Sequence, residues 1–317
     1  MGFSCPIAIA IGAFIIRMWR KSYRATATTA AVEHGTKQYT FHAAHHLDHT
    51  LPALDTISYS DDQSHLESSY QASLSLPNIL AYNVNPFMSY MTMEYVNGGD
   101  LHGVFEAPEE MVKIVLSHLG ATMAYLHVVE YAHRDIKPAN VGTMHYADGS
   151  QRFFVFDMGQ ATNQQVAETE GCGTPLTMAP EVSAGGKYDS CPVDWYSFGV
   201  TVLCLSLSEG EGITLYLEGP HKGDGFNLDN VRAKLEEKEF SSPTIDIITR
   251  LLAFDPTDRI TPLEVLEHTA LESVPDPFET IPGMDQYQWV LRRLKDGRAK
   301  KQQATEIAEL TERLANL

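Results

Sequence analysis

Apolar residues recur with two different periods along the chain, and the change between them divides it into two parts. Before residue 97 the apolar stretches are short and rich in β-branched and aromatic residues, as in 79–84 (ILAYNV) and 90–96 (YMTMEYV). Such stretches predict strands. Further strands are expected within 13–19, 25–32 and 38–44, and a helix within 51–76. Residues 13–96 therefore predict a small lobe that is mostly sheet.

From residue 97 onward the apolar residues follow a helical period. Residues 108–110 (PEE) begin a helix, because proline suits the first turn and acidic residues stabilise a helix N-terminus. A strand hairpin is expected within 140–156, around a turn at 147–149. Residues 194–206 are apolar on nearly every side, which predicts a helix buried in a core. We therefore expect a larger, helical lobe over residues 97–271.

The N-terminal end departs from this pattern. Residues 2–16 are almost wholly apolar, and the basic residues that follow are Arg17, Arg20, Lys21 and Arg24. One interpretation is a membrane anchor with the basic cluster on the cytoplasmic side. The other is a buried first strand with its lead-in, since a bilayer span needs about 20 apolar residues. We treat residues 1–12 as a separate apolar segment.

The C-terminal end forms a tail over residues 272–317. It begins with three prolines, so its first part is expected to be irregular. Apolar residues then follow at heptad spacing from Ile307 to Leu317. This run is short for a coiled coil and favours a helix that packs back on the domain.

The composition is that of an acidic globular protein. The 317 residues are 44% hydrophobic and 20% charged, with a net charge of −18. Such a chain repels the phosphate backbone, so we expect basic peptides or basic protein surfaces as partners and no nucleic acid. Four cysteines without CxxC spacing predict reduced thiols rather than a zinc site. We expect a cytoplasmic protein, with membrane association through the apolar segment left open.

Five motifs follow one another in the second half of the chain. They are 133–140 (HRDIKPAN), 157–159 (DMG), 173–181 (GTPLTMAPE), 192–199 (PVDWYSFG) and 255–259 (DPTDR). In this order they resemble motifs of the eukaryotic protein kinases of the serine/threonine type. The resemblance covers about residues 77–270. It implies an α+β, bilobal fold with a small β-rich lobe and a larger α-helical lobe.

The resemblance implies catalytic roles for individual residues. Asp135 would accept or orient the proton of the substrate hydroxyl, and Lys137 would neutralise charge on the transferred phosphate, because this transition state needs positioning and charge neutralisation. Thr174 belongs to the same catalytic set, in the segment that receives the peptide. Asn140 and Asp157 would supply oxygen ligands to Mg²⁺, which prefers them.

Three further roles follow from the same resemblance. Glu181 and Arg259 would form a buried ion pair. Arg134 would bind a phosphate on the activation segment, where Glu170 could mimic that phosphate and Thr169 is a neighbouring candidate for phosphorylation. This suggests a domain that needs no upstream kinase, with an ordinary surface glutamate as the alternative.

The small lobe carries the expected ATP-binding residues. Met93, Glu94 and Val96 resemble the gatekeeper and hinge, where the backbone would bond adenine. Asp100 would contact ribose or a basic substrate side chain. Glu67 stands where the family places the glutamate of its regulatory helix. The cofactors implied are therefore ATP and Mg²⁺.

Two family features are missing from the small lobe. No G-x-G-x-x-G occurs before residue 60, and His42 stands where the phosphate-binding lysine belongs. Arg24 could replace that lysine from the neighbouring strand; the alternative is that Arg24 is simply an exposed strand residue. Gln71 occupies a position where the family has an apolar residue.

The leading interpretation is a serine/threonine protein kinase that transfers the γ-phosphate of ATP to protein hydroxyls. The main alternative is a pseudokinase, a binding or allosteric module with weak or no phosphotransfer. Asp135, Lys137, Asn140 and Asp157 favour the enzyme, whereas the missing glycines and lysine favour the pseudokinase. A membrane-tethered scaffold is a third interpretation and rests only on the N-terminal segment.

Overall fold

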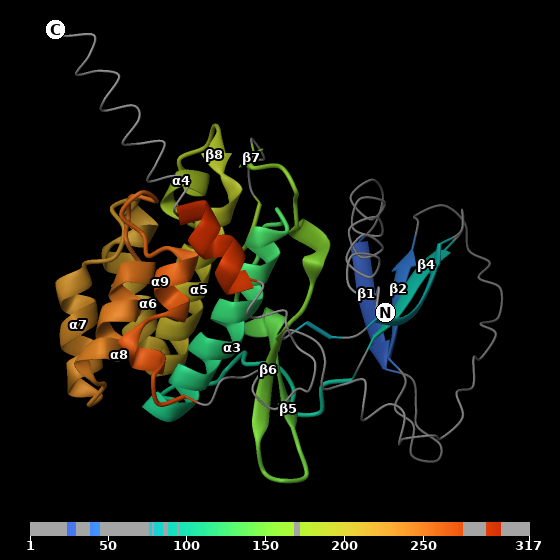
Figure 1. The fold of residues 1–317 in the computed structure, drawn as a ribbon, viewed down its shortest axis with the longest axis horizontal. Coiled ribbons are helices and arrows are strands. Elements are labelled where there is room, and N and C mark those ends of the chain that lie inside the picture. Colours follow the sequence, from blue (N-terminus) through green and yellow to red (C-terminus); the bar gives the residue numbers. More distant parts are fainter. Residues whose placement is uncertain are drawn as a thin grey trace, which may run out of the picture.

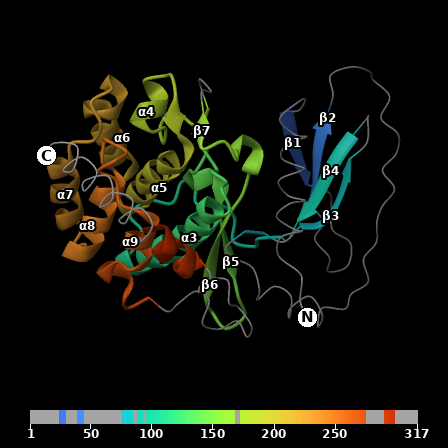
Figure 2. The same cartoon turned by 45° about the horizontal axis from the view of Figure 1, so that its top comes forward.

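Two parts make up the structure, a four-stranded sheet and a mostly helical body (Figure 1). The computed structural model describes residues 24–29, 39–44, 76–77, 79–84, 88–93, 95–167, 172–274 and 290–298. The segment that begins at Tyr95 leads from the sheet into the body, and Figure 2 shows the same division from a second direction. The expected fold of a small β-rich part and a larger helical part is confirmed.

The sheet is antiparallel, in the order β1-β2-β4-β3. Its strands are β1 (Arg24–Thr29), β2 (Tyr39–Ala44), β3 (Ile79–Val84) and β4 (Met88–Met93). β3 has the expected bounds, and the other strands overlap the stretches rich in β-branched and aromatic residues. The register places Arg24 opposite Ala44 and Thr26 opposite His42. Since positions alternate between faces along a strand, positions 24 and 42 belong to the same face of the sheet.

Two long helices form the centre of the body. α3 (Glu109–Val128) begins directly after Pro108, and α5 (Ser190–Ser206) covers the apolar stretch, so both sequence predictions are confirmed. α5 is buried on nearly every side and packs against α3 and α8 (Ser242–Leu251). Within the described part of the chain, α3 is the one helix long and apolar enough to cross a membrane, but most of it is buried inside the body.

The predicted hairpin is confirmed as β5 (Val141–His145) and β6 (Gln151–Val155), and β6 packs against α3. Gly149 in its turn has a φ of 87°, a conformation that glycine adopts without strain. Short 3₁₀ turns flank the hairpin, η1 (Pro138–Asn140) before it and η2 (Met158–Gln160) after it. Because Val141 pairs with Val155, the hairpin brings these two flanking turns close together.

Shorter elements complete the body. They are β7 (Val166–Ala167), α4 (Pro180–Ser183), β8 (Tyr188–Asp189), α6 (Glu209–Glu218), η3 (Pro220–Lys222), α7 (Leu228–Glu237), α9 (Pro262–Leu266) and η4 (Thr269–Leu271). Capping boxes begin α6 and α9. A last helix covers residues 290–298, and its Val290 is buried in the core. The sequence did not predict this helix, and the helix expected from the heptad spacing at 307–317 lies outside the described residues.

Several sequence predictions fall outside the described residues. They concern the strand at 13–19, the helix within 51–76 with Glu67 and Gln71, the hinge residue Glu94, Thr169 and Glu170, and the heptad-spaced residues at 307–317. These stay predictions.

Candidate active site

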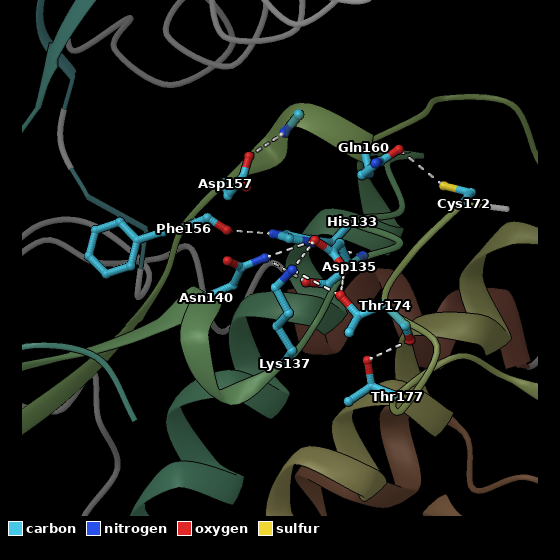
Figure 3. Close-up of polar contacts among 11 residues, drawn as sticks. His133, Asp135, Lys137, Asn140, Phe156, Asp157, Gln160, Cys172, Thr174 and Thr177 are labelled. Carbon is cyan, nitrogen blue, oxygen red and sulfur yellow. Dashed lines mark hydrogen bonds and ion pairs between the residues drawn. The ribbon is translucent and has the colours of Figure 1, made fainter. Parts of the chain in front are cut away.

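The carboxylate of Asp135 is the centre of a hydrogen-bonded cluster (Figure 3). Thr174 Oγ1 donates to Asp135 Oδ1 at 2.7 Å, and Lys137 Nζ donates to Asp135 Oδ2 at 2.8 Å. Lys137 also donates to Thr174 Oγ1 at 2.9 Å, so the three side chains form a closed triangle. Asn140 Nδ2 donates to the Asp135 main-chain oxygen at 2.8 Å. The structure thus brings together four residues that the sequence assigned to the site.

Asp194 in α5 anchors the loop that carries Asp135. Its side chain is fully buried and accepts hydrogen bonds from His133 N at 2.7 Å and Arg134 N at 2.6 Å. His127 Nε2 lies 2.9 Å from the same carboxylate. These contacts satisfy a carboxylate whose burial would otherwise be costly. Arg134 has a φ of 66°, and the two main-chain bonds help to offset the strain of that left-handed conformation.

His133 connects this loop to the end of the β5–β6 hairpin. Its Nδ1 accepts from Asp135 N at 3.2 Å, so Nδ1 is unprotonated and Nε2 carries the proton. Nε2 then donates to the Phe156 main-chain oxygen at 2.8 Å. Phe156 N in turn donates to the Asn140 main-chain oxygen at 2.8 Å. These bonds fix the position of Asp157, the next residue, relative to the catalytic loop.

Asp157 adopts a left-handed conformation with a φ of 58°, which is unusual outside glycine and is often found at functional sites. Its exposed carboxylate accepts from Gly159 N at 3.2 Å (Figure 3). The described residues show no direct side-chain contact between Asp157 and Asn140. The predicted metal ligands therefore lie on adjoining turns, with the Asp157 carboxylate turned towards its own loop.

The oxygens of this region fit a magnesium ion that is bound together with phosphates. Asn140 Oδ1 accepts no hydrogen bond from the described residues and points away from Asp135 in Figure 3. Within the described ranges, no group of three or more His, Cys, Asp or Glu side chains is arranged to hold a metal ion. Mg²⁺ at nucleotide sites is commonly held by one or two protein oxygens plus substrate phosphates. Asn140 and Asp157 are suited to that role.

Arg134 is buried and has partners within the body. Its Nε donates to the Gln160 main-chain oxygen at 2.8 Å, and Nη1 lies 3.5 Å from the Tyr188 hydroxyl. Cys172 Sγ donates to the Gln160 side chain at 3.3 Å, beside the same arginine. Burial raises the pKa of the Cys172 thiol, which keeps it protonated at neutral pH. Whether Glu170 also meets Arg134 stays a prediction.

The segment that carries Thr174 is fixed along its length. Ser197 Oγ donates to the Thr177 main-chain oxygen at 2.8 Å, and this bond ties the segment to α5. Further on, Arg259 donates to both Glu181 oxygens, at 2.8 Å and 3.2 Å. The buried ion pair expected between these two residues is therefore confirmed.

The predicted ATP-binding residues are described in part. Met93 ends β4, Val96 is buried and Arg24 begins β1, whereas Glu94 and Glu67 lie outside the described residues. The exposed Asp100 accepts from His102 N at 2.8 Å. The described residues do not show these positions in contact with the Asp135 cluster.

The sequence analysis did not assign roles to Asp194 and His127. Asp194 was part of a motif, and a single carboxylate in an otherwise apolar stretch was the available signal, because a buried charge needs partners. His127 gave no comparable signal. Its contact with Asp194 joins residues 67 positions apart, which a local pattern cannot reveal.

Comparison with known proteins identifies relatives of this chain. The model of the protein kinase domain matches residues 35–271. CBL-interacting serine/threonine-protein kinase 3 of Arabidopsis thaliana is 30% identical over 193 residues, which cover 56% of this chain and 40% of that protein. Serine/threonine-protein kinase PAK 4 of Mus musculus is 30% identical over 203 residues, 62% of this chain and 33% of that protein.

A more distant relative is the probable serine/threonine-protein kinase HSL1 of Saccharomyces cerevisiae. It is 27% identical over 203 residues, which cover 59% of this chain and 12% of that protein. The chain thus matches only 12–40% of the length of these three relatives. The kinase-domain match spans well over half of the chain and includes all five motifs, so this chain belongs to the protein kinase family.

Proposed function

We propose that this chain transfers the γ-phosphate of ATP to serine or threonine hydroxyls of protein substrates. Protein kinases generally use ATP and Mg²⁺. The observation that carries the proposal is the closed triangle of Asp135, Lys137 and Thr174. The related proteins of comparable sequence carry the name serine/threonine-protein kinase.

Each residue of the triangle has a distinct task in this reaction. Asp135 presents a carboxylate held in place by two donors, so it can orient a substrate hydroxyl and take up its proton. Lys137 brings a positive charge to the place where the phosphate would be transferred. Thr174 fixes the position of both side chains. Bound Mg-ATP would supply the phosphoryl group, with Asn140 and Asp157 holding the metal.

The substrate class that we favour is a basic protein segment. The chain has a net charge of −18, and the exposed side chains include Asp157, which directly follows the residue that His133 bonds. Acidic surroundings raise the local concentration of basic partners and speed their association. A basic residue near the phosphorylated hydroxyl would therefore lower KM.

The pseudokinase alternative depends on the sheet. His42 replaces the phosphate-binding lysine, and the glycine-rich motif is missing. Losing one electrostatic contact to a reacting group lowers rates by roughly 10²–10³, which weakens an enzyme without abolishing its activity. The alternative therefore predicts a protein that binds nucleotide poorly, rather than one with a disrupted Asp135 cluster.

Phosphate transfer to a generic basic protein with labelled Mg-ATP tests the proposal. Asp135→Asn keeps the size of the side chain but removes the proton acceptor, so we expect transfer to fall by about 10²–10⁴-fold. A parallel thermal shift with ATP, with and without Mg²⁺, reports binding separately from chemistry. Equal transfer by the parent and Asp135→Asn would refute the assignment. Absence of transfer by the parent would indicate the pseudokinase, and a weak or absent shift with Mg-ATP would then attribute the loss to nucleotide binding.

A further inference from the structure

The helix over residues 290–298 carries positive charge on an otherwise acidic protein. Residues 290–298 contain four basic residues and one acidic residue, whereas the chain as a whole has a charge of −18. The basic residues are Arg292, Arg293, Lys295 and Arg298. A concentration of like charge on such a background is typical of a surface that contacts an ion or polymer of opposite sign.

The helix is held on the body by its apolar side. Val290 is 1% exposed within the core, and Leu294 packs against the same core. Lys295 Nζ lies 2.8 Å from Glu267 at the end of α9, and the helix lies beside α9 in both views (Figures 1 and 2, red). Arg292 and Arg298 are exposed and make no ion pair or hydrogen bond with the described residues. The body therefore presents a fixed helix on which four of the six exposed residues are basic and one, Asp296, is acidic.

We propose that this basic helix binds the surface of a membrane that contains anionic lipids. Charge complementarity alone would also fit an acidic protein or a nucleic acid. The N-terminal sequence favours the membrane, because residues 2–16 are apolar and four basic residues follow within 17–24. An apolar segment too short to span a bilayer binds weakly alone, and a basic patch is the usual second contribution to stable attachment.

The basic helix can be attracted to anionic lipids even though the body as a whole is acidic. At physiological salt the Debye length is about 8 Å, so carboxylates on the far side of the body contribute little at the lipid surface. Each basic residue close to an anionic membrane contributes about 1 kcal/mol, which corresponds to about fivefold in affinity. The interaction would bring the kinase to substrates at the membrane, a role beyond phosphate transfer itself.

Co-sedimentation of the full chain with lipid vesicles tests this proposal. We expect binding to phosphatidylcholine vesicles that contain phosphatidylserine, little binding to phosphatidylcholine alone, and loss of binding at high salt. The double variant Arg292→Gln/Arg298→Gln should lose about fivefold per arginine. The control Lys222→Gln/Arg232→Gln removes the same charge from exposed positions in η3 and α7 and should bind like the parent.

Three outcomes would overturn the proposal. Equal loss in both double variants would show that bulk charge alone matters. Undiminished binding by Arg292→Gln/Arg298→Gln would exclude the helix as the contact surface. Tighter binding to an RNA homopolymer than to phosphatidylserine vesicles at the same salt would identify nucleic acid as the partner. All four substituted residues are exposed, so both double variants should fold and should unfold at the same temperature as the parent.

Discussion

Removal of Glu181 should strand a buried cation. The Arg259 side chain is 1% exposed and donates to both Glu181 oxygens. Its other acceptors are main-chain oxygens of Ala253, Pro192 and Phe254. Glu181→Ala would therefore leave the guanidinium hydrogen-bonded only to main-chain oxygens, among the described residues. Breaking a buried pair at one partner costs about 3–5 kcal/mol, a large share of the 5–15 kcal/mol that is typical of whole domains.

Two further variants separate the charge effect from lost packing. Glu181→Gln keeps the shape and one acceptor oxygen, so we expect a smaller loss of about 1–3 kcal/mol. Glu181→Ala combined with Arg259→Met leaves no stranded charge and should be more stable than the sum of the two single losses predicts. Urea unfolding followed by the fluorescence of the buried Trp195 measures all of these variants. A loss below about 1 kcal/mol for Glu181→Ala would refute the reasoning.

Two other predictions concern the buried His118 in the body and the pair of sheet residues Arg24 and His42. Burial, with a smaller contribution from Arg152, lowers the pKa of His118 from 6.5 to about 3. Between these values the unfolded state binds a proton that the folded state does not, so stability should fall by about 1.4 kcal/mol per pH unit as the pH drops from 6.5. His118→Gln should flatten that slope in urea unfolding at several pH values, and an unchanged slope would contradict it. In the sheet, Arg24→Ala should lower kcat/KM for ATP by about 10²-fold and His42→Lys should raise it, if Arg24 replaces the missing lysine. An Arg24→Ala variant as active as the parent would reject that replacement.

The sequence predicted elements whose signal is local. The proline before α3 with the acids in its first turn, the turn between β5 and β6, and the apolar stretch of α5 each lie within one stretch of chain. The Glu181–Arg259 pair was expected only through the family resemblance. The contacts of Asp194 with His133 and Arg134 were not predicted, because they join residues about 60 positions apart. Periodicity reports which side of an element is buried, but not which buried polar groups meet.

The basic helix over residues 290–298 is a second feature that local sequence patterns do not predict. Its charge was visible in the sequence, but the sequence alone does not show whether such a run lies on a helix held against the body. What distinguishes it is that Val290 enters the core and so fixes the helix on the body. Val290 lies well after the other core residues in the sequence, so its burial depends on tertiary packing and cannot be predicted from the spacing of apolar residues.

Among the described residues, the contacts that hold Asp135 all lie inside the body. Asp194 holds its loop from α5, His133 holds it from the hairpin, and Thr174 holds the carboxylate from the activation segment. None of these three contacts involves the sheet. The missing glycines and lysine therefore affect how nucleotide is held, but not how the proton acceptor is placed. Weak activity should accordingly appear as a raised KM for ATP, with much of the rate recovered at high ATP concentration. A low rate that stays low at saturating ATP would instead place the defect at Asp135 and its partners.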